Sequence, residues 1–488
     1  MRKKKIIVVM ASIFSLAVSM TACSGKDEKK SSGEKVVLRI LENDTAKEEG
    51  YLDELISAFN EKYKDQGIEA VDANMDEYSD LAANGPYGYG PDVLYQANDK
   101  LMTYAEDKHI LAINPEDYEC YGTTAKEAWS AFDISIDGKT YTCGIPVNVQ
   151  EPMLFYREDL IPENWESEWD KDSNQVPDFF ENWNDLYKLS KQLRDSDSSA
   201  NKDEKFGFMS SFNNLYLNAN FFLSYGAYIF GKDDAGIYDS SDIGFAKGDA
   251  ANGIEALIQF ASVMDEGCID DTIITNRYDK LGNGSYFCSV STPDTYSLFI
   301  AKLALHYEED GLSETEANEK ARENLKMIEL PALMPADGDL SKDSSTMKDS
   351  DWVKTVVMGG VNGYGISSYT EHRDEAKLFV DFATSYEMIN KRTQILGIAP
   401  TRSDVAKENG GTADTIFASL ESGRIMLMPS IKAVDQIWKP VQTLMGDFAK
   451  EPFRSDAEKK YANKDDINTA LEKASKDIYD AIYTLSDK

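Results

Sequence analysis

Segments typical of buried strands and of amphipathic helices alternate along the chain from residue 36 onward. Residues 36–41 are apolar and β-branched, as in a buried strand, and residues 52–63 place apolar side chains on one face of a helix. A second strand is expected at 68–71, after Gly67, and a third at 91–95 with a helix behind it. This alternation predicts an α/β fold with a mainly parallel sheet, whose ligands bind outside the carboxyl ends of the strands.

The later part of the chain continues the pattern. Apolar side chains at helical spacing predict further helices at 254–261, 378–382 and 467–482. The stretch 335–351 is rich in Asp, Ser and Lys, which is typical of an exposed loop. The glycine-rich run 359–365 lacks a phosphate-loop lysine, so we expect a tight turn beside a strand there.

Length and charge narrow the classes of function. A chain of 488 residues is too long for one core, so two lobes are expected. Acidic residues outnumber basic ones 86 to 51, giving a net charge of −35, so nucleic acid is a poor partner. The three histidines, His109, His306 and His372, offer little for imidazole-rich metal sites. No GxxxxGK[ST], HExxH or GxSxG motif occurs, and acidic pairs such as Glu308-Glu309 are expected to be solvated surface.

The N-terminus has the pattern of an export signal. Residues 1–22 consist of a basic start, an apolar run and then small residues at the expected cleavage site, a pattern that predicts a signal peptide. Thr21-Ala22-Cys23 resembles a bacterial lipobox, which would make Cys23 the lipidated first residue of the mature protein. The alternative is an ordinary secretory signal with an uninvolved Cys23. Residues 23–34 are polar and suit a flexible tether, so the expected location is the outer face of the bacterial cytoplasmic membrane.

Four further cysteines leave two possibilities open. None forms a CxxC pair, and an exported chain can form disulfides in any of three connectivities. Free buried thiols fit equally well, so the sequence does not decide the state of these four residues, Cys120, Cys143, Cys268 and Cys288.

An acidic stretch at 170–181 predicts a structural calcium site. A twelve-residue calcium loop supplies oxygens from positions 1, 3, 5, 7, 9 and 12. Gln175 stands where glycine usually makes the turn, and Pro177 follows a carbonyl ligand, so plain acids at a helix start are the alternative. The expected ligands are Asp170, Asp172, Asn174, the carbonyl of Val176, Asp178 and Glu181.

Several separated motifs lie along residues 36–485. They are GPDVLYQANDK (90–100), DGKTY (137–141) with GIP (144–146), LFYREDL (154–160), NWNDL (182–186), GYGIS (363–367), EAKLF (375–379), GIAP (397–400) and MPSI (428–431) with Trp438. In their order and spacing, more than in any single motif, they resemble family 1 extracellular solute-binding proteins, the sugar receptors of ABC importers. The segments GYGIS and EAKLF resemble that family's return strand and helix. The C-terminal motif, with a Trp ten residues after its Met, is similar to the maltose/maltodextrin-binding branch.

The resemblance implies a two-lobe periplasmic-binding-protein-like fold with a ligand cleft between lobes and hinge crossovers. The N-terminal lobe is expected at 35–147 plus 361–406 and the C-terminal lobe at 148–360 plus 407–488. Carboxylates, amides and aromatic rings from both lobes would bind the hydroxyls and apolar faces of a sugar. Residue by residue, the implied ligand-binding side chains are Asn43, Asp44, Asp99, Lys100, Gln150, Tyr216 and Trp438.

Structural roles compete with some of these assignments. Tyr216 and Trp438 fit core packing as well, and Asp99 fits a helix N-cap. The chain also departs from the maltodextrin branch, because Gln96, Ala219 and Asp294 replace aromatic platforms. Tyr95 and Tyr296 are neighbouring rings that could substitute for them.

The sequence therefore predicts a lipid-anchored, monomeric receptor without catalytic activity. It would capture an oligosaccharide, with a maltodextrin as the leading candidate, and deliver it to an ABC permease. A carbohydrate-active enzyme is one alternative, which would need two opposed carboxylates. A surface-anchored lipoprotein that binds peptides or proteins is the other.

Overall fold

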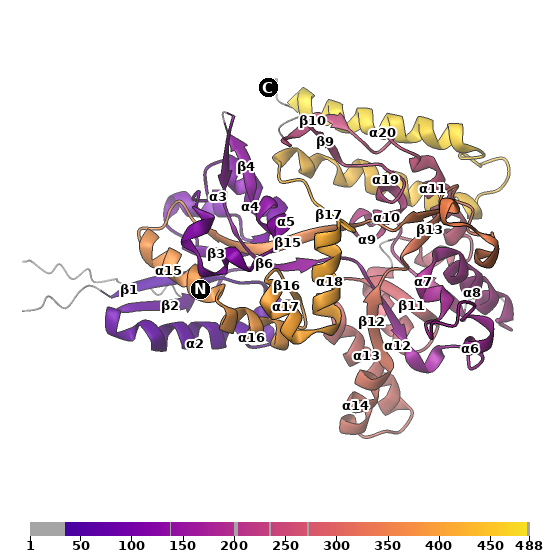
Figure 1. Cartoon of the computed structure of the whole chain (residues 1–488), viewed down its shortest axis with the longest axis horizontal. Helices are drawn as coiled ribbons and strands as arrows, with labels where there is room; N and C mark the ends of the chain where they lie inside the picture. Colours follow the sequence, from indigo (N-terminus) through magenta and orange to yellow (C-terminus); the bar gives the residue numbers. More distant parts are fainter. Residues whose placement is uncertain (1–34, 137, 200–203, 234–235, 271–272, 486–488) are drawn as a thin grey trace, which may run out of the picture. The chain divides into compact units, whose positions relative to one another are not determined.

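The computed structural model describes residues 35–136, 138–199, 204–233, 236–270 and 273–485 (Figure 1). The predicted signal peptide, Cys23 and the tether lie outside this part of the chain. Among the described residues, no helix is both long and apolar enough to cross a membrane.

The first main sheet contains seven strands. Strand β1 pairs in parallel with β2 and β3, as predicted, but β15, β6 and β16 join antiparallel. The prediction of a mainly parallel sheet is therefore wrong, because the chain re-enters the sheet at β15 after a long excursion and runs against β3. The spatial order is β16 (Ala399–Pro400), β6 (Ile145–Gln150), β15 (Val357–Ile366), β3 (Val93–Ala97), β1 (Val36–Leu41) and β2 (Ile68–Asp72), with β17 (Ile425–Leu427) beside β15.

Helices cover both faces of this sheet (Figure 1). Helices α2 (Tyr51–Tyr63), α15 (Arg373–Ala383) and α16 (Tyr386–Leu396) share one apolar cluster, in which Phe59 meets Phe379 at 5.0 Å between ring centroids. Helix α4 (Asn98–Glu106) packs on β3 and β15 through a separate cluster. The predicted helix at 52–63 and the strand after Gly67 are confirmed.

A second sheet of four strands lies in the same apolar cluster as α4. Its order is β12 (Leu325–Glu329), β7 (Met153–Arg157), β11 (Tyr286–Ser291) and β8 (Phe206–Met209). Strand β6 ends one sheet at Gln150 and β7 begins the other at Met153, so the chain passes between the sheets through two residues. The exact lobe boundaries stay a prediction. The longer helices that follow along the chain are α8 (Trp183–Ser196), α11 (Ala250–Ala261), α12 (Ile273–Gly282), α13 (Tyr296–Glu309), α14 (Glu314–Asn324), α18 (Gly411–Ser422), α19 (Trp438–Ala449) and α20 (Lys464–Leu485).

Short elements fill the connections. In the described part of the chain, three strand pairs lie outside the main sheets: β4 (Asp133–Ile136) with β5 (Lys139–Thr142), β9 (Phe230–Lys232) with β10 (Tyr238–Ile243), and β13 (Leu333–Pro335) with β14 (Trp352–Lys354). The short helices are α1 (Asp44–Glu48), α3 (Leu81–Asn84), α5 (Lys126–Ser130), α6 (Trp165–Glu168), α7 (Asp178–Glu181), α9 (Leu215–Asn218), α10 (Asn220–Leu223) and α17 (Ser403–Asn409).

The glycine-rich run lies inside strand β15, so the prediction of a tight turn is wrong. A Cβ at Gly359 would lie 2.1 Å from the Ile425 side chain, and one at Gly363 would lie 2.3 Å from the Ile145 carbonyl oxygen. These glycines let β17 and β6 approach β15 closely, which a sequence pattern of local turn residues does not reveal.

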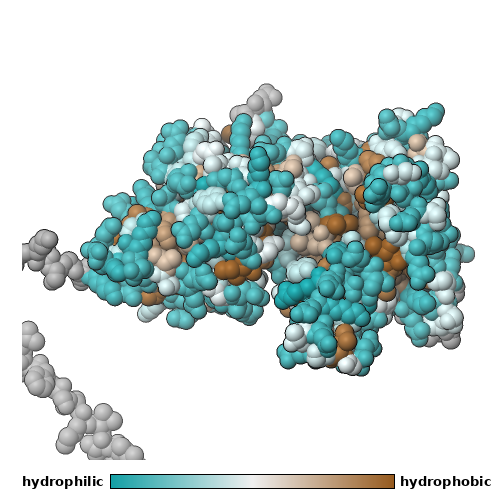
Figure 2. All heavy atoms as spheres, turned by 60° about the horizontal axis from the view of Figure 1, so that its bottom comes forward, coloured by the Kyte–Doolittle hydropathy of each residue, from teal (hydrophilic) through white to brown (hydrophobic). Residues whose placement is uncertain are grey.

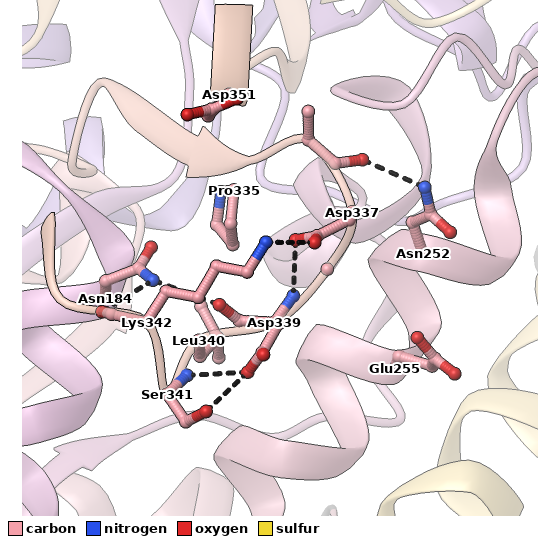
Figure 3. Close-up of polar contacts among 12 residues, drawn as sticks. Asn184, Asn252, Glu255, Pro335, Asp337, Asp339, Leu340, Ser341, Lys342 and Asp351 are labelled. Atoms are coloured by element: carbon pink, nitrogen blue, oxygen red, sulfur yellow. Dashed lines mark hydrogen bonds and ion pairs between the residues drawn. The ribbon is translucent and has the colours of Figure 1, made fainter. Parts of the chain in front are cut away.

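The stretch 335–351 is largely exposed, as predicted, but it is fixed to the helices beside it (Figure 3). The side-chain amide of Asn184 on α8 donates to the Asp339 carbonyl at 3.1 Å, and that of Asn252 on α11 donates to the Ala336 carbonyl at 2.9 Å. Leu340 is buried at the centre of the loop.

The cysteines outside the signal region are free and buried, which settles the alternative that the sequence left open. They are Cys120, Cys143, Cys268 and Cys288.

Candidate ligand-binding site

The first predicted site residues follow strand β1. Asn43 caps helix α1, and its side-chain oxygen accepts the Ala46 backbone N–H at 2.9 Å. Asp44 is exposed, and its backbone N–H donates to the Glu77 carboxylate at 2.8 Å. The Glu77 carbonyl also accepts a hydrogen bond from the side chain of Gln96 at the end of β3. Glu77 therefore joins the ends of two neighbouring parallel strands, where the fold is expected to bind its ligand.

Asp99 and Lys100 lie in the first turn of α4 and point to different surroundings. Ala97 occupies the cap position, so the alternative in which Asp99 is the N-cap is wrong. Burial raises the pKa of Asp99 and the Asp435 carboxylate raises it further, while the Lys100 backbone N–H lowers it. Lys100 is exposed, and its Nζ lies 4.8 Å from the Tyr104 ring centroid on the same helix.

Gln150 and Tyr216 meet where the chain leaves the first sheet. The Tyr216 hydroxyl donates to the Gln150 carbonyl at 3.1 Å. Burial raises the pKa of Tyr216, and the carboxylates of Asp294, Glu151 and Asp99 raise it further. The structure therefore brings the Tyr216 hydroxyl onto the backbone of Gln150, and the charges of Asp99 and of Asp294, which lies just before α13, act on the pKa of this tyrosine.

Trp438 begins helix α19 and is half-buried. Its helix packs against α9, which carries Tyr216. The Trp438 ring also borders the main apolar cluster. Both stacking on a ligand and core packing thus stay compatible with its position.

Two buried polar residues were missed by the sequence analysis. The Asn98 side chain is fully buried, donates to the Met428 carbonyl at 3.1 Å and accepts the Val361 N–H at 3.2 Å. Glu151 is 1% exposed, and burial raises its pKa to about 8, with a further contribution from Glu329. Each is adjacent in sequence to a predicted site residue, but their burial depends on contacts between distant segments.

The lost aromatic platforms are only partly replaced. Tyr95 is 2% exposed, and Arg392 lies 4.1 Å from its ring centroid, so this ring is not available to a ligand. Tyr296 is half-buried at the start of α13. Tyr78, beside Glu77, is 80% exposed. Of the two rings considered from the sequence, only Tyr296 is open to a ligand.

Residues 54–419 match the family described as bacterial extracellular solute-binding protein, which is more than half of the chain. The chain belongs to this family. Its members are binding receptors, so this solute-binding protein is not an enzyme.

Two curated relatives come from Bacillus subtilis (strain 168). The maltodextrin-binding protein MdxE is 30% identical over 49% of this chain and 51% of its own length. A galactooligosaccharide-binding protein is 32% identical over 53% of this chain and 55% of its own length. The matches thus span about half the length of either relative.

Solved structures show the two-lobe α/β fold that the motifs predicted. The maltose-binding protein MalE of Listeria monocytogenes, in complex with maltose, superposes with a TM-score of 0.67 at 17% identity, covering 92% of this chain and 98% of that one. MalX of Streptococcus pneumoniae, in complex with maltopentaose, gives a TM-score of 0.66 at 17% identity, covering 91% and 100%.

The predicted calcium loop of the solute-binding protein brings three carboxylates together. Oxygens of Asp172, Asp178 and Glu181 lie within 4.8 Å of one another, which is a possible acidic metal-binding triad. Burial raises the pKa of Glu181, and the other loop carboxylates raise it further. Gln175 adopts a φ of 68°, so it takes the left-handed turn that glycine usually makes.

Other predicted ligands of the loop have different partners. The Asp170 carboxylate accepts the backbone N–H groups of Asn174 at 2.9 Å and of Gln175 at 3.2 Å. The Asn174 amide donates to Glu181 at 2.7 Å. Lys171 Nζ lies 3.5 Å from the Asp178 carboxylate, and the positive charge of the lysine partly neutralises that carboxylate. Three of the predicted ligands, Asp172, Asp178 and Glu181, therefore lie close enough together to bind one cation, while Asp170 and Asn174 make hydrogen bonds within the loop.

Proposed function

We propose that this solute-binding protein captures an oligosaccharide outside the cytoplasmic membrane and delivers it to an ABC permease. A maltodextrin is the leading candidate and a galactooligosaccharide the second, as the names of the two curated relatives suggest. The observation that carries the proposal is the hydrogen bond of the Tyr216 hydroxyl to the Gln150 carbonyl at the passage between the two sheets, beside carboxylates such as Asp99 whose charge raises the pKa of Tyr216. An aromatic ring beside carboxylates and amides matches the apolar face and the hydroxyls of a sugar.

The ligand-binding residues proposed are those expected from the sequence. Asp44 and Asp99 would accept hydroxyl hydrogens, Gln150 and Asn43 would bind through their amides, and Lys100 would donate. Tyr216 and Trp438 would stack on sugar faces. Closure of the two lobes about the crossover segments would bury the sugar, as in other hinge-bending receptors.

Titration calorimetry with maltodextrins and galactooligosaccharides tests the proposal. We expect binding by one of the two series and a raised melting temperature, because a ligand that binds only the folded state stabilises it. Asp99→Asn should weaken binding, whereas Asp374→Asn should not, although Asp374 also lies in the first turn of a helix. If neither series binds, the alternative of a peptide- or protein-binding receptor gains support.

We further propose that Cys23 carries the lipid anchor and that the chain acts as a monomer. The polar residues 23–34 would then tether the folded part to the membrane. Cells that express Cys23→Ser should release the protein into the medium, while the unaltered protein should stay with the membrane fraction. Release of both forms would contradict the anchor.

For the acidic triad we propose a structural Ca²⁺ ion. Hard cations of this kind prefer several carboxylate oxygens, and the mutual repulsion of Asp172, Asp178 and Glu181 favours one. Chelator-treated protein should bind one Ca²⁺ per chain and melt at a higher temperature with it. Asp172→Ala with Glu181→Ala should abolish both effects, and Asp349→Ala, at an exposed acid elsewhere, should change neither. Absence of heat and of stabilisation at millimolar calcium would refute the site.

A further inference from the structure

Two tyrosines project into solvent from the loop before β3. Tyr87 is 77% exposed and Tyr89 is 70% exposed. Apart from Tyr78, which lies beside Glu77 and near Asp44, no other large apolar or aromatic side chain in the described part of the chain is more than 50% exposed. Figure 2 shows a face of the molecule on which hydrophilic residues predominate. Two rings this exposed, two residues apart on one loop, indicate a surface that contacts another body.

The loop that carries these rings is held in place by its glycines and by β1. Gly85 begins a 3₁₀ turn, and a Cβ there would lie 2.2 Å from the Tyr369 ring. Gly88 follows the turn with a φ of 73°, in the left-handed region that favours glycine. The Arg39 guanidinium on β1 donates to the carbonyls of Gly88 at 3.3 Å and of Tyr89 at 3.0 Å. The rings are therefore presented by an ordered loop, which lowers the entropic cost of a contact.

The rings lie beside the first residues of β1. Val37 and Arg39 of this strand line a cavity of about 330 Å³ together with Gly88 of the loop. Val37 is itself 40% exposed. Val37, Tyr87 and Tyr89 form what we call the tyrosine patch.

The tyrosine patch lies at the end of β1 that the N-terminal segment joins. Residues 23–34 connect the proposed lipid anchor at Cys23 to Lys35, which directly precedes β1. Twelve residues span at most about 40 Å when fully extended, so an anchored chain keeps the start of β1 within that distance of the bilayer. The candidate site residues Asn43 and Asp44 follow the other end of the same strand.

Charge and side-chain chemistry favour a lipid surface as the body that the patch contacts. The whole chain has a net charge of −35, which anionic lipids repel, but residues 23–35 contain four lysines against three acids. Tyrosine side chains prefer the headgroup level of a bilayer, because the ring is apolar and the hydroxyl stays hydrated there. The same acidic charge disfavours a second copy of this chain as the partner.

We propose that the tyrosine patch rests on the outer surface of the cytoplasmic membrane, with the rings of Tyr87 and Tyr89 at the level of the lipid headgroups. The contact rests on the proposed lipid anchor and adds an orientation to it. The end of β1 that carries the patch faces the bilayer, and the end that carries Asn43 and Asp44 stays accessible to sugars.

Fluorescence quenching on the whole anchored chain tests the contact. The cysteines that the structure describes are buried and Cys23 would be acylated, so a thiol-reactive dye labels an introduced cysteine selectively. Glu371→Cys places an environment-sensitive dye at an exposed position that lines the cavity beside the patch. The labelled chain is inserted through its anchor into vesicles of phosphatidylcholine and phosphatidylglycerol whose headgroups carry a nitroxide. We expect the dye to lose most of its emission to the nitroxide.

Removal of the two rings separates the patch from the tether. Tyr87→Ser with Tyr89→Ser should restore the emission at position 371, and it should leave the melting temperature unchanged because both side chains are exposed. Tyr479→Ser, at an exposed tyrosine on α20, is the matched control and should keep the quenching. A dye at Glu319→Cys, an exposed position on α14, should keep its emission in the same vesicles.

The outcomes distinguish the patch from the anchor. Quenching at position 371 that survives the double substitution, equal quenching at position 319, or no quenching in protein that floats with the vesicles overturns the patch and leaves the anchor standing. A shift of the dye emission without quenching would indicate a protein partner or a second copy in place of the bilayer, and would also overturn the patch. If the unaltered chain does not float with the vesicles, the proposed anchor fails and the patch fails with it.

Discussion

Glu151 makes the stability of the fold depend on pH. It lies between the end of β6 and the start of β7, is 1% exposed, and has one carboxylate oxygen without a hydrogen-bond donor among the described residues. Burial raises its pKa from 4.5 to about 8; Glu329 raises it too, and Arg424 lowers it. The folded chain therefore holds this carboxyl group protonated at neutral pH.

The sign of the effect follows from proton linkage. Below pH 4.5 the Glu151 carboxyl is protonated in both the folded and the unfolded chain, so its ionisation does not change the free energy of unfolding. Between pH 4.5 and about 8 only the unfolded chain releases the proton, so the free energy of unfolding falls as the pH rises. At about 1.4 kcal/mol per pH unit, the loss is about 3 kcal/mol at pH 7 and about 5 kcal/mol above pH 8.

The substitution Glu151→Gln removes the titration and keeps the size and a hydrogen-bond acceptor. Urea unfolding at pH 5, 7 and 8.5 should show little difference between variant and unaltered protein at the lowest pH. The variant should be the more stable by several kcal/mol at the highest. Glu319→Gln, at an exposed position on α14, is the matched control and should show no such trend. A difference between the Glu151 variant and the unaltered protein that does not change with pH would refute the reasoning.

Two further perturbations test the site and its support. If the Trp438 ring stacks on sugar, Trp438→Ala should lose about 1–3 kcal/mol of ligand affinity while the protein stays folded. Unchanged affinity in calorimetry would reject that role, and loss of folding would favour core packing. Arg392→Met should destabilise the fold by about 3–5 kcal/mol in urea unfolding, because it leaves the fully buried Glu42 carboxylate, now 2.7 Å from the guanidinium, without a counter-charge. Glu42→Leu added to it should restore much of the stability, and equal stability of all forms would contradict this account.

Local patterns in the sequence were enough for most elements of the fold. The helix at 52–63 has a clear apolar face, and the strand after Gly67 follows a residue at φ 74°, so both could be predicted. The local pattern did not predict strand β15, because its glycines resemble turn residues and their role depends on distant partners such as Ile425 and Ile145. Only the resemblance of GYGIS (363–367) to the family's return strand indicated a strand there. The antiparallel pairing of β15 with β3 likewise results from the way the chain comes back to the first sheet after a long intervening segment, and the local sequence of β15 does not indicate it.

The candidate site divides in the same way. Asp44 and Asp99 stand just after strand ends, where the fold class places ligands, so their neighbourhood could be predicted from order along the chain. The sequence did not predict that Tyr95 is unavailable as a platform, because this ring is buried beneath Arg392, a residue almost 300 positions further along the chain. Residues of α1, α14 and α16 line a cavity of about 760 Å³ together with Tyr296, and no single motif encodes this combination.

The buried amide of Asn98 explains how the site stays ordered where the sheets end. Buried backbone groups need partners, and strands that leave a sheet lose the partners that a ladder provides. Asn98 replaces them on two segments at once, since it donates to the Met428 carbonyl and accepts the Val361 N–H. Asp99 is the next residue along the chain, so its carboxylate is held in place relative to both segments.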